Sequence, residues 1–294
     1  MFKRFAACGA ALTMMHGCAV GPDYVEPETE LEDTFVEARE ALYSEDPIPP
    51  TLWESFGDPD LEALIERALT ENTTIAQAFA TLNETRALSG LTVYSWFPTA
   101  GIGIDATRNQ PSSRDPFIPP GVSATDLYRA GFDMSWEIDL FGRLRSLNEG
   151  IRQRVEADTA ALQAAQLSIV AEVAQSYFSL RGAQQRLLVQ QRNLDNLVDN
   201  VRILEASLEA GRGTALDVAR VKSLERTLAA QLPQTQASIA RSEQRLGVLT
   251  AQGVDDLRDQ LTVLRELPAV PDMVPVGTPQ EWLRRRPDVQ AAER

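Results

Sequence analysis

Residues 128–140 alternate between apolar and polar side chains at successive positions. The apolar residues share one parity: Tyr128, Ala130, Phe132, Met134, Trp136, Ile138 and Leu140. The residues between them are charged or small: Arg129, Gly131, Asp133, Ser135, Glu137 and Asp139. Successive side chains of a β-strand point to opposite faces of a sheet. The pattern therefore predicts a strand with one apolar face and one polar face.

A second alternating segment, residues 99–109, precedes the first. Its apolar residues are Ala100, Ile102, Ile104 and Ala106. The proline-rich residues 110–126 between the two segments suit an exposed loop, so the pair predicts a β-hairpin. A tilted strand of about 9–11 residues crosses a bilayer. A hairpin in a soluble β-sandwich would alternate in the same way, but no other segment alternates well enough to pack on this one, which favours a transmembrane hairpin.

Aromatic residues gather near one end of this predicted hairpin. They are Tyr94, Trp96, Phe97, Trp136 and Phe141. Such a cluster is typical of the belt of aromatic residues at a membrane–water interface.

Helical patterns occupy most of the remaining chain. Asp58 at an N-cap position and Pro59 at the first helical position begin an amphipathic helix that extends to about Gly90. From Arg143 to Ala210 the sequence favours helix without a proline, over roughly 100 Å at ~1.5 Å per residue. Apolar residues recur there at every seventh position: Val173, Leu180, Leu187, Leu194, Val201 and Leu208. A seven-residue repeat predicts coiled-coil-like packing.

A turn at Gly211 separates the long helix from another one. Thr214 can cap the helix of residues 215–250, which we expect to bend or restart at Pro233. The helices of residues 58–90 and 215–250 together match the long helix in length. We therefore expect them to stack end to end alongside it.

The end of the chain resembles an earlier segment. Residues 68–78 and 282–292 align at one constant offset, which pairs Leu69 with Leu283 and Ile75 with Val289. This alignment predicts the beginning of a second copy of the same structural unit.

Composition and the N-terminus narrow the function. The net charge of −14 argues against a nucleic-acid-binding protein, which needs a basic face. Lys3 and Arg4 precede an apolar run that ends just before Gly17-Cys18, so residues 1–17 are typical of a lipoprotein signal and Cys18 of the lipid-modified residue. Ordinary cleavage near Cys18 without lipidation is the alternative. Either way His16 is removed, so we expect no Cys/His metal site, no His-based triad and no cofactor.

Three features invite other chemistry. Glu137 and Asp139 lie about 7 Å apart if both are on a strand, a spacing that two glycosidase carboxylates can have. Gly211 and Gly213 suggest a phosphate loop, but they follow a helix rather than a strand. Residues 284–286 are three consecutive arginines at a predicted helix start. We favour strand-end charges, a turn and a helix start, respectively, over an enzyme site.

Four motifs together resemble the TolC-type outer-membrane efflux proteins, in particular the lipoprotein (OprM/NodT-like) branch. These motifs are CAVGPDY (18–24), WEIDLFGRLRS (136–146), GRGTALDV (211–218) and RRPDVQAAE (285–293). The resemblance implies a mainly α-helical fold with a transmembrane β-hairpin, in which a long helical hairpin forms part of a trimeric α-barrel and β-barrel channel. Each protomer of the family has two repeats, so we expect this chain to be a fragment whose second repeat is cut off after Arg294. A periplasmic coiled-coil adaptor or scaffold lipoprotein without a pore is the alternative, although an adaptor should have β-rich domains after its helical hairpin.

The resemblance also implies roles for individual residues. Passive export of small molecules would take place through a lumen made negative, and therefore cation-selective, by the residues Asp105, Asp133, Glu137 and Asp139. The turn would be the periplasmic tip that contacts the adaptor through Gly211, Arg212, Gly213, Thr214, Leu216 and Asp217. The implied partners are two further copies of the chain, a periplasmic adaptor, an inner-membrane pump and outer-membrane lipid.

The expected organisation follows from these assignments. It comprises the signal peptide (1–17), a tether (18–57), a first helical segment (58–98), the transmembrane hairpin with its extracellular loop (99–140), the periplasmic helical hairpin (141–252), and a connector with the start of the second repeat (253–294).

Overall fold

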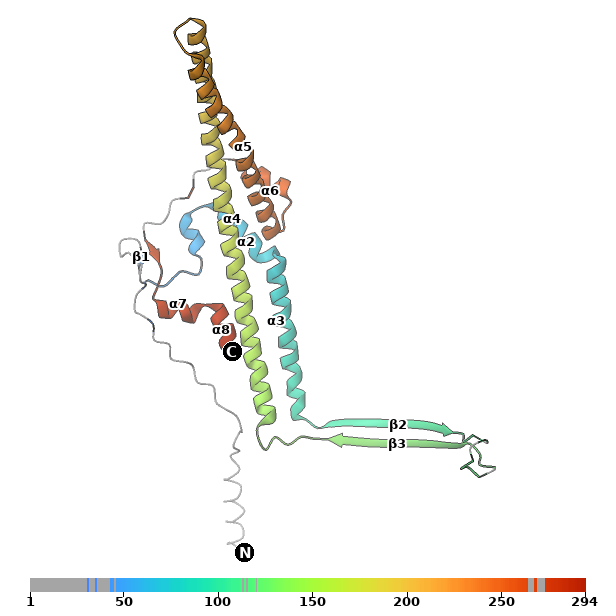
Figure 1. Ribbon diagram of the computed structural model, residues 1–294. Coiled ribbons are helices and arrows are strands. Elements are labelled where there is room, and N and C mark those ends of the chain that lie inside the picture. The colour runs from blue at the N-terminus through green and yellow to red at the C-terminus, as the bar shows by residue number, and fades with distance from the viewer. Residues whose placement is uncertain are drawn as a thin grey trace. The chain divides into compact units, whose positions relative to one another are not determined.

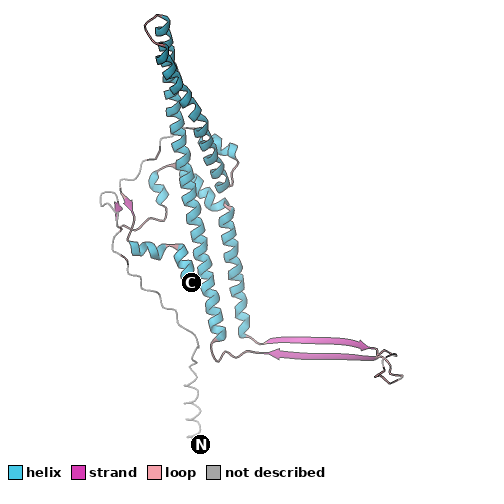
Figure 2. Ribbon diagram, viewed as in Figure 1, coloured by secondary structure: helices cyan, strands magenta, loops and turns pink. Residues whose placement is uncertain are grey.

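A computed structural model describes residues 31, 35, 43–44, 46–112, 114, 116–119, 121–263, 267–268 and 273–294. The predicted signal peptide and Cys18 lie outside these residues. The chain divides into two compact units, of which the first contains residues 83–155 and the second contains residues 28–82 and 156–294. Helices predominate, and the longest strands form a single hairpin (Figures 1 and 2). Within the described part of the chain, no helix is both long and apolar enough to span a bilayer.

The first predicted helix is two helices. The short 3-10 helix η1 (Leu52–Phe56) is followed by α2 (Pro59–Glu71), whose N-cap is Asp58 as predicted. The chain then breaks at Asn72 and continues as α3 (Thr73–Thr92). The Asn72 side-chain oxygen accepts hydrogen bonds from the N–H groups of Thr74 (2.9 Å) and Ile75 (3.3 Å). An amide that caps the next helix therefore produces the break, which the hydrophobic stripe did not reveal.

The long helical hairpin agrees with its prediction. Helix α4 (Arg143–Glu209) and helix α5 (Ala215–Thr250) are joined by a turn at Gly211. Gly211 has a φ of +68°, which glycine adopts at low cost. Helix α5 continues through Pro233 instead of restarting there. Pro233 removes one backbone hydrogen bond from the helix, and its side chain is exposed.

The hydrophobic core lies where α2, α4, α5 and α6 (Val254–Leu261) meet. Its α4 members include Val173 and Leu180 of the seven-residue repeat, and both are fully buried. The Asn72 side-chain nitrogen donates to the Leu249 carbonyl at 2.9 Å, which joins the α2–α3 break to the C-terminal end of α5. The C-terminal end of α5 therefore meets the start of α3, whereas α2, which was predicted to be part of the stack, packs against α5.

Two short strands and two short helices complete the second unit. Strand β1 (Tyr43–Ser44) pairs in parallel with β4 (Val274–Pro275), so the segment called a tether pairs with the connector. Helix α7 (Pro279–Arg285) begins with a capping box at Thr278, and α8 (Pro287–Glu293) follows after Arg286. The break at Arg286 falls at the position that the sequence alignment pairs with Asn72. The similarity between these two segments therefore extends to their local structure.

The strand hairpin belongs to the first unit. After the 3-10 helix η2 (Val93–Trp96), β2 (Thr99–Asn109) pairs antiparallel with β3 (Thr125–Ser135). The register runs from Thr99 opposite Ser135 to Asn109 opposite Thr125. The hairpin is confirmed, but β3 ends at Ser135, before the alternating pattern ends at Leu140.

Candidate functional site

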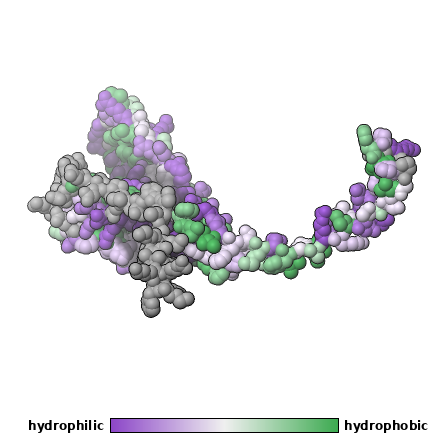
Figure 3. All heavy atoms as spheres, turned by 90° about the horizontal axis from the view of Figure 1, so that it is seen from below, coloured by the Kyte–Doolittle hydropathy of each residue, from purple (hydrophilic) through white to green (hydrophobic). Residues whose placement is uncertain are grey.

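The strand hairpin has one apolar face, which is exposed. Residues directly opposite each other in an antiparallel pair share a face. The apolar pairs are Ala100–Met134, Ile102–Phe132, Ile104–Ala130 and Ala106–Tyr128. Exposure is 80% for Ile102, 82% for Ile104 and 77% for Tyr128. Figure 3 shows apolar side chains on the surface of the hairpin. A continuous exposed apolar surface of this kind marks a contact with lipid or protein.

The opposite face of the hairpin is polar, and several of its positions are glycines without a side chain. Gly101 lies opposite Asp133, Gly103 lies opposite Gly131, and Asp105 lies opposite Arg129. A Cβ atom on Gly101 would lie 2.9 Å from both carboxylate oxygens of Asp133, so that carboxylate extends across Gly101. The carboxylate of Asp105 instead accepts a hydrogen bond from the Thr107 hydroxyl at 2.9 Å. Two of the four predicted lumen residues, Asp105 and Asp133, thus share the polar face of the hairpin.

The other two predicted lumen residues do not lie on a strand. Glu137 and Asp139 belong to the connector between β3 and α4. The Arg143 guanidinium binds Glu137 through two hydrogen bonds, of which Nε to Oε1 is 2.6 Å. The Asp139 carboxylate accepts the backbone N–H groups of Leu144 and Arg145, both at 3.1 Å, and so caps α4. The prediction that all four acids share one strand face is wrong for this pair, because the capping interaction ends the strand pattern.

Both connector carboxylates are held in the ionised form. The hydrogen bonds from Arg143 lower the pKa of Glu137. Burial raises the pKa of Asp139, but the N–H groups of Leu144 and Arg145 outweigh it, so this pKa is also lowered. A glycosidase pair needs one carboxyl with a raised pKa to act as the general acid. The glycosidase interpretation therefore has no support in this geometry.

Exposed aromatic side chains surround the base of the hairpin. The Trp136 indole N–H donates to the Trp96 carbonyl at 3.3 Å, which ties the connector after β3 to the residues before β2. Phe97 and Phe141 are largely exposed. Tryptophan rings, which have an apolar body and a polar N–H, suit a membrane–water interface.

The predicted tip residues form a tight, exposed turn. The Gly211 N–H donates to the Leu208 carbonyl and the Arg212 N–H to the Ser207 carbonyl, both at 2.9 Å. A Cβ atom on Gly213 would lie 3.3 Å from the Leu208 nitrogen, so a larger side chain at this position would disturb the turn.

The start of α5 is fixed beside this turn. Thr214 caps α5 by accepting the Asp217 N–H, while the Leu216 side chain is exposed. An ion pair between Lys222 and Glu205 joins the two helices just behind the turn. The turn therefore presents a preformed surface on a helical support.

A buried polar network was not predicted from the sequence. The Arg181 guanidinium on α4 is 1% exposed and binds Asp60 Oδ2 at 2.8 Å. It also donates to the carbonyls of Leu261 (3.0 Å), the last residue of α6, and Val263 (2.9 Å), two residues later. One arginine thus connects α4 to the start of α2 and the end of α6.

Tyr177 extends the same network by one turn of α4. Its hydroxyl donates to Asp58 Oδ2 at 2.6 Å and accepts from Arg181 Nε at 3.2 Å. Burial, followed by the hydrogen bond to Asp58, raises the pKa of Tyr177 to about 12. The N-cap of α2 is therefore held by a neutral phenol across most of the pH range. Asp58 was predicted as a cap. Its hydrogen bond with Tyr177, more than a hundred positions away, could not be predicted, because it leaves no periodic pattern in the sequence.

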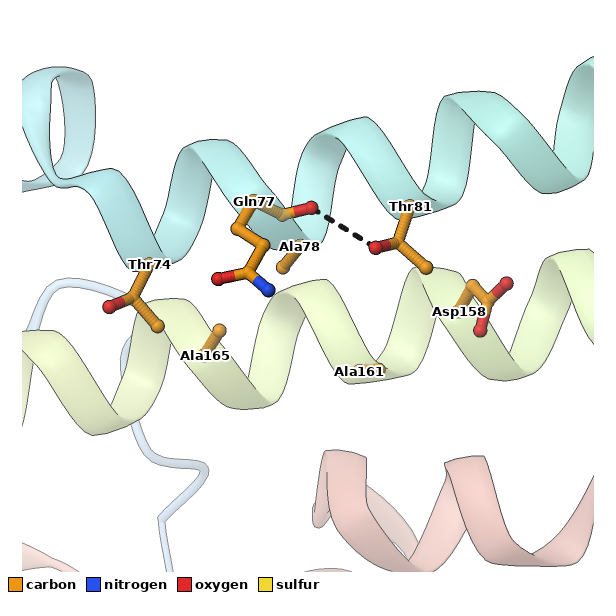
Figure 4. Close-up of a pocket in the computed structure, with 7 residues that line it drawn as sticks. All are labelled: Thr74, Gln77, Ala78, Thr81, Asp158, Ala161 and Ala165. Atoms are coloured by element: carbon orange, nitrogen blue, oxygen red, sulfur yellow. Dashed lines mark hydrogen bonds between the residues drawn. The ribbon is translucent and has the colours of Figure 1, made fainter.

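A groove of about 330 Å³ lies between α3 and α4 (Figure 4). Its lining is composed of short or polar side chains: Thr74, Gln77, Ala78, Thr81, Asp158, Ala161 and Ala165. The Thr81 hydroxyl bonds the Gln77 carbonyl of its own helix at 3.2 Å. These side chains make a shallow helix–helix groove rather than a catalytic arrangement.

Comparisons with known proteins agree with this architecture. The family model for outer membrane efflux proteins matches residues 64–252. Nodulation protein T of Rhizobium leguminosarum bv. viciae is 26% identical over 289 residues, which cover 96% of this chain and 57% of that protein. The toluene efflux pump outer membrane protein TtgI of Pseudomonas putida is 28% identical over 291 residues, covering 96% of this chain and 61% of that protein.

A solved structure is similar over nearly the whole chain. The outer-membrane channel OprN superposes with a TM-score of 0.81 at 35% sequence identity, covering 94% of this chain and 61% of that one. The chain thus spans 57–61% of the length of these three proteins. The matched helices and strand hairpin are the elements described above, and the chain belongs to the outer membrane efflux protein family.

Proposed function

We propose that the protein is the outer-membrane channel component of a tripartite efflux system, through which small molecules leave the periplasm passively. The observation that carries the proposal is the β2–β3 hairpin, whose apolar face is about four-fifths exposed at Ile102 and Ile104. A soluble protein would have to cover this face. Lipid covers it when the hairpin lies in the outer membrane and its helices extend into the periplasm.

The two faces of the hairpin then have different surroundings. The apolar face contacts hydrocarbon, and the polar face with Asp105 and Asp133 lines a water-filled lumen. Two strands leave unpaired backbone groups at both edges, which a bilayer does not tolerate. The hairpin therefore requires further strands beside it, which a homotrimer of the family's two-repeat protomers supplies.

The helical tip is the surface that meets the periplasmic adaptor. Its exposed residues are Gly211, Arg212, Gly213, Thr214 and Leu216, and the partly exposed Asp217 lies beside them. A rigid turn that is already ordered loses little conformational entropy on docking. An inner-membrane pump supplies the energy and selects the exported compound, since the channel residues described here form no enclosed binding site for one.

Two further assignments belong to the same proposal. Cys18 carries the lipid that anchors the mature chain to the outer membrane. The matched family consists of efflux proteins rather than enzymes, and we assign the chain no catalytic role. The alternative of a poreless adaptor or scaffold is not favoured, because both the matched family and the exposed strand face support a channel.

Deletion of the gene and conductance of the purified protein test the proposal together. Cells without the gene should accumulate a fluorescent efflux substrate, and a plasmid carrying the complete gene should restore export. The protein purified from outer membranes should give stepwise conductance in planar bilayers. Unchanged accumulation together with no conductance would refute the channel function.

A further inference from the structure

The charges on the polar face of the hairpin are not equivalent. Within the two strands, this face carries Asp105, Asp133 and Arg129. The ion pair between Arg108 and Asp126, at 3.7 Å, lies on the other face. The two connector acids described above are each bound by an arginine. The polar face of the hairpin thus has two carboxylates and one guanidinium.

Only one of these carboxylates has a neighbouring cation. Asp105 lies directly opposite Arg129 in the register, so their fields largely cancel at a distance. Asp133 lies opposite Gly101, and among the described residues it has no ion-pair partner. The uncompensated negative charge of this face is therefore at Asp133.

Glycine determines where the Asp133 carboxylate can lie. Both of its oxygens occupy the space that a Cβ atom on Gly101 would need, at 2.9 Å. A Cβ atom on Gly103 or Gly131, further along the same face, would meet nothing within 4 Å. The contact is thus specific to Gly101, and an alanine there would displace the Asp133 carboxylate, since a flexible side chain moves more easily than backbone.

We propose that Asp133, positioned across Gly101, is the residue that determines the cation preference of the strand-lined passage. Asp105 contributes little because Arg129 offsets it. The inference rests on the proposed channel function, in which this face lines the lumen. One Asp133 carboxylate from each protomer of a symmetric trimer forms a ring of charge, and rings of acidic side chains select cations.

The reversal potential of the purified channel in a KCl gradient tests the assignment. Four variants of the protein expressed from its complete gene are compared with the wild type: Asp133→Asn, Arg129→Gln, Gly101→Ala and Gly103→Ala. Asp133→Asn keeps the shape and removes the charge, so the cation preference should be lost. Arg129→Gln exposes Asp105 and should increase the preference. Gly101→Ala should reduce it by displacing the carboxylate, whereas the matched Gly103→Ala should leave it unchanged.

The outcomes separate this inference from the channel function. Wild-type conductance with a cation preference supports the function by itself. A wild-type reversal potential in Asp133→Asn would overturn the assignment to Asp133 while the channel function stands. Equal effects of the two glycine variants would overturn the positioning role of Gly101. Absence of conductance in the wild type would refute the channel function itself.

Discussion

Replacing Arg181, whose side chain is buried, by methionine should lower the free energy of unfolding of the second unit. Methionine fills similar space but removes the guanidinium that binds the Asp60 carboxylate, which is only 15% exposed. It also removes the Arg181 donor from the Val263 carbonyl and from the Leu261 carbonyl, which keeps only the Gln184 side-chain nitrogen at 3.2 Å. Removing one member of a buried ion pair costs about 3–5 kcal/mol, because the remaining charge is desolvated and uncompensated.

The expected cost can be measured as a change in Tm. For a domain of roughly 150–250 residues, 1 kcal/mol corresponds to about 2–4 °C. Arg181→Met should therefore lower the Tm, followed by circular dichroism of the detergent-solubilised protein, by roughly 6–20 °C. Arg202→Met on the same helix is the matched control, because Arg202 is 80% exposed in its pair with Asp199. Surface substitutions of this kind change stability by less than about 0.5 kcal/mol.

A double variant separates loss of the ion pair from loss of packing. Arg181→Met combined with Asp60→Asn also removes the carboxylate charge that has lost its guanidinium, so the double variant should recover part of the lost Tm. If Arg181→Met unfolds within about 2 °C of the control, the value expected for less than 1 kcal/mol, the buried network does not stabilise the unit. If the double variant recovers nothing, the cost comes from packing rather than from charge.

Two other predictions follow from the structure, and one follows from the sequence of the N-terminus. The raised pKa of Tyr177 means that its neutral form stabilises the fold. This contribution is complete below pH 10 and is lost as the pH rises towards about 12. The Tm of Tyr177→Phe should therefore be lower than that of the wild type at pH 8, and the difference should shrink at pH 12. Gly213→Trp or Leu216→Asp should abolish export in a drug-susceptibility assay while cross-linking still shows the trimer, and normal export would contradict the tip assignment. Cys18→Ser should remove incorporation of labelled palmitate, and unchanged labelling would place the lipid elsewhere.

The elements with strong periodicity could be predicted from the sequence. The alternation of residues 99–109 and 128–135, the seven-residue repeat on α4 and the cap at Thr214 each depend on neighbours in sequence, and each is present in the structure. Of the candidate site, Asp105 and Asp133 lie together on the predicted polar face. The exposed turn at residues 211–217 is also where the sequence placed it.

The remaining features depend on contacts that no local pattern records. The chain breaks at Asn72 because its amide both caps α3 and reaches the end of α5. Strand β3 ends early because Asp139 binds the first N–H groups of α4, although the alternation of residue types continues past it. Arg181 is buried among groups brought together by folding, so its charge gave no indication of its position.

The Asn72–Leu249 junction restricts how the helical hairpin can change length during evolution. The junction fixes one end of α5 against α2 and α3, while the Gly211 turn fixes its other end to α4. An insertion in α4 between Arg181 and the turn shifts every later residue of the packing stripe relative to α5. Insertions or deletions should therefore survive only in pairs of equal size, one in each helix, and preferably in multiples of seven residues that preserve the facing side chains. Related proteins with longer or shorter hairpins should differ by such paired steps.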